Sequence, residues 1–170
     1  MDSTDLLHIL KEQAREISNE DICLARASIV DSVQDLPEKY RRAYSSDYFA
    51  YMYAAFQELR TCKISDKGEP VDIEEHRDLL LRISQQKDEG NARQRAFRRF
   101  VAVVIPYLAF IAGRTIHPPG MIFPGGLMIT SQGSEYYCPV KNKQSGVELA
   151  LCDFCKCRDS GELKEGVPDS

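Results

Sequence analysis

The chain has 170 residues, of which 43% are hydrophobic and 28% charged, and its formal net charge at pH 7 is -4. This length and composition are typical of one globular domain with a buried core. The net negative charge argues against a general polyanion-binding role, so nucleic-acid or phosphate binding would need a local basic patch.

Two further features predict a cytoplasmic protein that has no contact with a membrane. The first residues, 1–5, are acidic and polar, unlike the positively charged start of a secretory signal. The longest apolar run, residues 100–112, contains Pro106 and is too short to span a bilayer. We therefore expect the cysteines to be reduced, as they are in the cytoplasm.

The first two thirds of the sequence show the apolar periodicity of helices. In the first expected helix Leu6 and Leu10 share one face, and Ser3 or Thr4 is the expected cap. The last expected helix is the most apolar and should lie at the centre of the fold, with a kink at Pro106 and Gly113 as its C-terminal cap. The expected helices cover residues 5–18, 19–36, 37–59, 71–86 and 91–112.

The sequence changes character after Gly113. Residues 114–126 contain too much proline and glycine for a helix or a long strand. Residues 127–130 and 135–138 are expected to form two short strands around a turn. Residues 158–170 have almost no apolar side chains, which predicts a disordered tail.

These elements together predict a mainly α fold. A bundle of about five helices, residues 1–113, should carry a second segment, residues 114–157, packed against it. That segment holds the proline- and glycine-rich loop, the short β-hairpin and a cysteine metal knuckle. The tail, residues 158–170, should not contribute to the core.

Four of the six cysteines lie close together near the end of the chain. Cys138, Cys152, Cys155 and Cys157 have the spacing C-x13-C-x2-C-x-C. Converging thiolates repel one another unless a cation neutralises them, so this density indicates a soft metal site. We expect structural zinc, with the first ligand at a strand end and a close pair on the following turn. Cys23 and Cys62 are distant and are not expected to take part.

The cysteine spacing leaves other interpretations open. A zinc ribbon has two C-x-x-C pairs, but Lys141 stands three residues after Cys138. An iron–sulfur cluster also accepts four thiolates with irregular spacing, and a metal-free set of thiols or a redox pair is a third interpretation. A less favoured possibility is a three-cysteine catalytic zinc with an open position, where His117 or Asp153 would be the alternative ligand.

A group of basic residues opens the last expected helix. Cations there oppose the helix dipole, and an anionic ligand, partner or nucleic acid would relieve the conflict. We favour the simpler interpretation, a solvated face paired with Asp88, Glu89 or other acidic residues, and nucleic acid is the less favoured partner. The candidate anion-binding residues, including two beyond this helix, are Arg93, Arg95, Arg98, Arg99, Arg114 and His117.

Four tyrosines, at 40, 44, 48 and 51, follow helical spacing. Such a stripe is more typical of a core edge than of a ligand pocket. The segment His117-Pro118-Pro119-Gly120 has the composition of a ligand loop, but we favour a connection that steers the chain across the end of the bundle.

Three segments of the C-terminal third resemble a protein family. They are Phe123-Pro124-Gly125-Gly126, Tyr136-Tyr137-Cys138-Pro139-Val140-Lys141 and Leu151-Cys152-Asp153-Phe154-Cys155. Together they resemble an archaeal family of unknown function found largely in methanogens. The resemblance implies a small archaeal protein with no established activity or cofactor to transfer. It gives iron–sulfur some support, because anaerobic methanogens use such clusters heavily.

The sequence has no convincing nucleophile or acid/base constellation. It therefore favours a non-enzymatic, zinc-stabilised helical protein that binds a protein or an anionic partner. The alternative function is an iron–sulfur redox or metallocofactor-handling protein, in which Arg93, Arg98, Arg114 and His117 hold an anionic ligand near the cluster.

Overall fold

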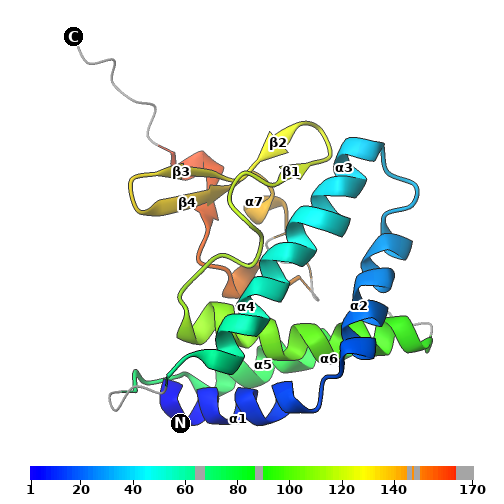
Figure 1. Ribbon diagram of the computed structural model, residues 1–170. Coiled ribbons are helices and arrows are strands. Elements are labelled where there is room, and N and C mark those ends of the chain that lie inside the picture. Colours follow the sequence, from blue (N-terminus) through cyan, green and yellow to red (C-terminus); the bar gives the residue numbers. More distant parts are fainter. Residues whose placement is uncertain (64–67, 87–89, 145–146, 148–149, 164–170) are drawn as a thin grey trace.

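The computed structural model describes residues 1–63, 68–86, 90–144, 147 and 150–163. Helices form most of the molecule, and short strands gather in the C-terminal part (Figure 1). The mainly α fold class is therefore confirmed. Within the described residues, no helix is long and apolar enough to cross a membrane.

The first two helices begin with side-chain caps. Helix α1 (Ser3–Arg15) is capped by Asp2, which forms a reciprocal capping box with Asp5. The expected cap at Ser3 or Thr4 was wrong, because the carboxylate of Asp2 already accepts the Asp5 N–H. Helix α2 (Asn19–Ser32) starts at the expected residue and is capped by Ser18.

The third expected helix is one continuous helical segment with a wider turn in its middle. Helix α3 (Glu38–Arg42) continues into the π-helical η1 (Ala43–Tyr48) and then into α4 (Phe49–Thr61). Single π turns inside helices are frequent at functional sites. Here the π segment carries Tyr44 and Tyr48 toward the C-terminal part of the chain, where both contact aromatic rings of residues 117–123.

The fourth and fifth expected helices are also present. Helix α5 (Ile73–Gln85) is capped by Asp72, and α6 (Ala92–Pro106) by Asn91. The π-helical η2 (Tyr107–Ile111) directly follows Pro106, the residue at which a kink was expected. Proline lacks the N–H for the regular α pattern and its ring crowds the carbonyl four residues earlier. Gly113 then ends the helix with φ 59°, as predicted.

The C-terminal part differs in detail from the prediction. The hairpin partner of β4 is β3, whereas β2 pairs with β1. The predicted disordered tail is wrong at its start, because β5 pairs in parallel with β4 and adds an edge to the small sheet. Residues 164–170 of that tail lie outside the described residues. The elements are β1 (Ile122–Phe123), β2 (Leu127–Met128), β3 (Thr130–Gln132), β4 (Glu135–Cys138), α7 (Lys141–Gln144), η3 (Cys152–Phe154), β5 (Arg158–Asp159) and η4 (Ser160–Glu162).

One hydrophobic core joins the helices to the C-terminal part. Phe100, Val104 and Leu108 of α6 and η2 are fully buried at its centre. The same core cluster contains Ile129, Phe154 and other residues from beyond the helices. Helix α6 thus occupies the central position expected from its apolar sequence, and the cysteine-bearing segment packs on the bundle.

Candidate functional site

The four C-terminal cysteines lie on the wall of one cavity. Cys138 ends β4, Cys152 opens η3, Cys155 follows that turn and Cys157 precedes β5. All four line a cavity of about 490 Å³ between this segment and the bundle. The structure therefore brings together the cysteines that the sequence grouped. Cys23 is exposed and Cys62 donates to the Leu59 carbonyl, so both lie apart.

The thiols of this cavity influence one another's ionisation. Hydrogen bonding from the Cys157 thiol lowers the pKa of Cys155 to about 6, and the Ile116 N–H donates to the same sulfur at 3.4 Å. The same contact raises the pKa of Cys157. Burial raises the pKa of Cys152 to about 11 and also raises that of Cys138. Negative charge would therefore collect first on Cys155.

The cysteines are not arranged as a coordination sphere. In the described part of the chain, no three Cys, His, Asp or Glu side chains form a group that could hold a metal ion. The structure thus places the four predicted ligands on a common wall and leaves their sulfurs outside metal-binding geometry. Asp153, a predicted alternative ligand, forms an ion pair with Arg82 at 2.9 Å.

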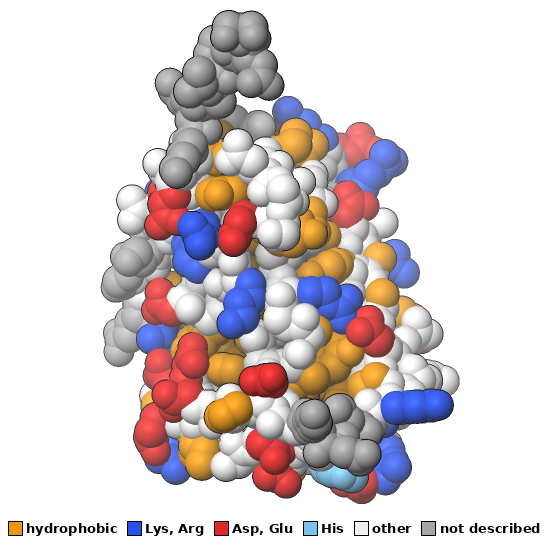
Figure 2. Space-filling model, turned by 90° about the vertical axis from the view of Figure 1, so that its left-hand side faces the viewer, with side chains coloured by type: hydrophobic (Ala, Val, Ile, Leu, Met, Phe, Trp, Pro, Cys, Tyr) orange, Lys and Arg blue, Asp and Glu red, His pale blue; other side chains and the backbone are white. Residues whose placement is uncertain are grey.

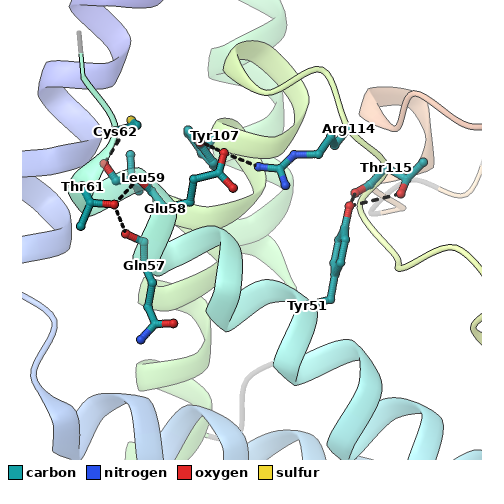
Figure 3. Close-up of polar contacts among 9 residues, drawn as sticks. All are labelled: Tyr51, Gln57, Glu58, Leu59, Thr61, Cys62, Tyr107, Arg114 and Thr115. Carbon is teal, nitrogen blue, oxygen red and sulfur yellow. Dashed lines mark hydrogen bonds and ion pairs between the residues drawn. The ribbon is translucent and has the colours of Figure 1, made fainter. Parts of the chain in front are cut away.

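The segment after η2 is fastened to the bundle by an ionic and hydrogen-bonded network (Figure 3). The Glu58 carboxylate accepts from the Tyr107 hydroxyl at 2.7 Å and from the Arg114 guanidinium at 2.9 Å. These two donors lower the pKa of Glu58, the tyrosine hydroxyl having the larger effect. The network fixes the point at which the chain leaves the bundle for the cavity.

Residues 115–117 connect this anchored point to the Cys155 sulfur. The Tyr51 hydroxyl donates to the Thr115 carbonyl at 2.6 Å (Figure 3). The Thr115 hydroxyl in turn donates to the His117 carbonyl at 2.7 Å. Ile116 lies between these anchors and directs its N–H to Cys155. A backbone N–H toward a sulfur stabilises the thiolate form, so this contact also lowers the Cys155 pKa.

Two cationic side chains, Lys141 and Arg82, hold the cysteine turn in place. Lys141 donates to the Cys155 carbonyl at 2.8 Å and to the Cys157 carbonyl. Arg82 of α5 donates to the Ala150 carbonyl at 2.9 Å and lies over the Phe154 ring at 5.1 Å from its centre. The turn is therefore attached both to α7 and to α5.

His117 belongs to the cavity and not to a basic cluster. Its ring stacks on Tyr48, with the centres 4.8 Å apart, and meets the edge of Phe123 at 5.6 Å. Burial lowers the pKa of His117 to about 4, so the imidazole is neutral near pH 7. A neutral imidazole offers no positive charge to an anion, but its unprotonated ring nitrogen can still accept a hydrogen bond or bind a metal.

The predicted anion-binding arginines are dispersed and engaged. Arg93 pairs with Asp31 at 2.7 Å and Arg99 pairs with Asp21 at 2.5 Å, both on α2. The favoured interpretation named paired acidic residues, and these partners fit it; Asp88 and Glu89 lie outside the described residues. Two other arginines donate to main-chain carbonyls, Arg95 to Gly90 and Arg98 to Ser84.

The joint anion site near a cluster is not formed by these side chains. Arg93 and Arg114 lie at opposite ends of α6 and η2, about 30 Å apart at 1.5 Å per residue. On another face of the molecule, seen from the left-hand side of Figure 1, basic and acidic side chains lie interspersed (Figure 2). A single anion therefore does not reach both ends of the proposed set.

Sequence analysis missed several residues of the cavity. Tyr44 and Tyr48 were assigned to a core edge, yet both line the cavity with Lys141. Their spacing with the following tyrosines was visible, but the side of the helix they occupy depends on where residues 117–123 pack. Tyr51 takes the separate role of anchoring Thr115.

Comparison with known proteins identifies relatives along nearly the whole chain. The family described as "Uncharacterized protein conserved in archaea (DUF2115)" matches residues 2–160. The UPF0305 protein MJ0646 of Methanocaldococcus jannaschii is 34% identical over 165 residues, covering 96% of this chain and all of the relative. A UPF0305 protein of Methanothermobacter thermautotrophicus is 27% identical, covering 91% of this chain and 94% of the relative.

No solved structure matches the chain. The family match extends well beyond the C-terminal motifs that carried the resemblance and includes the helical bundle. The chain belongs to the archaeal family of uncharacterised DUF2115 proteins.

Proposed function

We propose that this protein binds a soft metal ion, zinc in the first place, through Cys138, Cys152, Cys155 and Cys157. The metal would be structural: it would fasten the C-terminal segment to the helical bundle, and the protein would not be an enzyme. The observation that carries the proposal is that four thiols from separate turns and strands line one cavity. Thiolates are the preferred protein ligands of zinc and other soft metals.

The four thiols are suitable zinc ligands, but their side chains would have to move closer together to bind one ion. Zinc–sulfur bonds are about 2.3 Å long, so the four side chains have to draw together when a metal binds. The Cys155 and Cys157 thiols already contact each other. The Ile116 N–H and the Lys141 ammonium lie beside them and would offset part of the thiolate charge.

The partner in this proposal is a protein or an anionic molecule in the cytoplasm. A metal-fixed C-terminal segment would hold Leu127, Met128 and Val147 on the surface, where they are 38%, 45% and 48% exposed. Contiguous exposed apolar side chains mark protein-binding surfaces, and Leu127 and Met128 are neighbours in β2. The engaged arginines give an anionic partner less support than the apolar residues give a protein.

An iron–sulfur cluster is the second candidate, and the cavity supports it. The space beside the four sulfurs, about 490 Å³, extends beyond the volume that one ion would occupy. A cluster takes the same four thiolates with irregular spacing. This alternative would make the protein a redox or cofactor-handling protein.

Metal content decides between these candidates. We would purify the protein anaerobically, measure zinc, iron and labile sulfide per chain, and record its absorption spectrum. One zinc with no visible band supports the structural site, whereas iron with sulfide and a visible band supports the cluster. Less than about 0.1 metal ion per chain, after loading with zinc or with iron and sulfide, refutes both.

Cysteine variants assign the site within the chain. Cys138→Ser and Cys155→Ser should each lose the metal and loosen the C-terminal segment. Cys23→Ser and Cys62→Ser remove thiols outside the cavity. These two variants should keep the metal and the attachment of the C-terminal segment. Equal metal content in all four variants would contradict the assignment.

A further inference from the structure

The cavity beside the cysteines has an aromatic wall that the metal proposal does not use. The Tyr48 and His117 rings are stacked with an interplanar angle of 30°. Phe123 stands edge-on to His117 and, at 6.4 Å between ring centres, to Tyr44. Four rings from η1 and from residues 117–123 therefore surround one side of the cavity.

Another part of the lining comes from the central helix α6. Val101 and Ile105 of α6 face the cavity, and both are almost completely buried. They belong to a helix whose position is fixed by the core around Phe100 and Val104. The lining thus combines an aromatic part, in which Tyr48 and His117 are stacked and Phe123 stands edge-on, with an aliphatic part on α6.

The charge of the lining restricts what the cavity can accept. Among the described residues that line it, there is no aspartate or glutamate. The lysine in this lining, Lys141, already donates to two main-chain carbonyls. An ionised ligand would therefore lose its hydration without gaining a free counter-charge, which opposes its binding.

We propose that this cavity binds an uncharged, planar heteroaromatic molecule of one or two fused rings. The molecule would contact the rings of Tyr48 and His117 and the side chains of Val101 and Ile105, which all line this cavity. The volume of the cavity, about 490 Å³, lies within the range of small-molecule sites, about 300–1,000 Å³. Aromatic stacking supplies affinity, and the tyrosine hydroxyls, the imidazole and the sulfurs supply polar contacts for the ring edge.

The inference does not rest on the metal, because the aromatic and aliphatic walls come from residues outside the cysteine set. It goes beyond the proposed function by assigning an organic ligand to the space beside the sulfurs. The two proposals fail separately: metal content tests the cysteines, and ligand binding tests the rings.

The first test uses indole as the probe and indole-3-carboxylate as its charged counterpart. We would follow Tyr48 and His117 ring signals by NMR during titration of the full-length protein, with benzimidazole as a second uncharged probe. Indole should bind with a Kd below about 1 mM and shift those ring signals. Indole-3-carboxylate should bind at least ten-fold more weakly.

Variants then locate the probe. Val101→Phe fills the cavity and should weaken indole binding at least ten-fold, and Phe123→Leu removes one ring while keeping an apolar side chain, with a smaller loss. Val30→Phe adds the same bulk at a site on α2 that is 44% exposed and should change nothing. Metal content should stay the same in the Phe123 variant.

Three results overturn the inference. The first is that neither indole nor benzimidazole binds at 5 mM to folded protein. The second is that the carboxylate binds as tightly as indole. The third is that Phe123→Leu leaves both the affinity and the ring shifts unchanged, a readout that remains even if Val101→Phe does not fold.

Discussion

Arg82 joins the helical bundle to the cysteine-bearing turn, and its replacement measures how firmly the two are attached. The guanidinium pairs with Asp78 at 3.0 Å and with Asp153 at 2.9 Å, and it donates to the Ala150 carbonyl at 2.9 Å. It also lies over the buried ring of Phe154. Only 21% of the Arg82 side chain is exposed, so Arg82→Gln removes contacts that are partly shielded from water.

The size of the effect follows from these contacts. Each carboxylate partner is about half exposed, so each ion pair contributes only about 0.5 kcal/mol. The charged hydrogen bond to the Ala150 carbonyl adds about 1 kcal/mol, below the usual range because it is partly solvated, and the cation–π contact adds about 0.5 kcal/mol. Because the contacts share one side chain, we expect a total loss of about 2 kcal/mol, or about 4–8 °C in Tm.

The assay is thermal unfolding of purified variants, combined with limited proteolysis. The matched control is Arg77→Gln on the same helix, because Arg77 pairs with Glu74 and both side chains are largely exposed, at 68% and 78%. This control should lose less than about 0.5 kcal/mol. In Arg82→Gln, cleavage should appear first in residues 138–158, where the attachment is lost.

Equal loss of stability in the two variants would refute this reasoning. So would an Arg82 variant that unfolds earlier without faster cleavage of the cysteine segment. Either result would mean that the C-terminal part is held by its apolar core and not by Arg82.

Three further predictions concern single residues. Glu58→Gln should lower Tm at pH 7. The pKa of Glu58 is lowered in the folded protein, so the carboxylate stabilises the fold above the unfolded carboxyl pKa and loses this effect as pH falls. The difference in Tm between variant and wild type should therefore shrink between pH 5 and 3. A pH-independent difference would contradict this. Gly113→Ala should cost about 1 kcal/mol in chemical unfolding because φ is 59°, whereas Gly113→Asn should cost less; equal costs would assign the effect to side-chain bulk. Ser18→Ala should cost about 1 kcal/mol by removing the cap on the Asp21 N–H, whereas Ser18→Asp should keep most of the stability.

The helical elements were predictable because their signals are local. Apolar residues at helical spacing, capping residues and the left-handed glycine at 113 act within a few residues of the backbone they control. Each expected helix is therefore present, with ends displaced by a few residues. The cap of α1 was misassigned because Asp2, Ser3 and Thr4 are all suitable caps, and local sequence does not choose among them.

The strands were less predictable because pairing is not local. Residues 127–132 carry two strands that pair with different partners, one before and one after them. Strand β5 was missed because Arg158 and Asp159 have no apolar pattern and are ordered by pairing with β4. Such edge strands are held by main-chain hydrogen bonds, so their side-chain pattern does not predict them.

The amino-acid pattern was enough to predict the helical bundle, the central position of α6 and the grouping of the four cysteines. The packing of the folded chain was needed to show that these thiols line one cavity together with Tyr44, Tyr48 and His117. It also showed that Arg93 and Arg99 of α6 pair with acidic residues of α2, whereas Arg95 and Arg98 donate to main-chain carbonyls. These two kinds of feature differ in how far apart in the sequence the interacting residues lie. Helix formation depends on neighbours within a few residues, whereas a cavity wall depends on how segments about a hundred residues apart pack together.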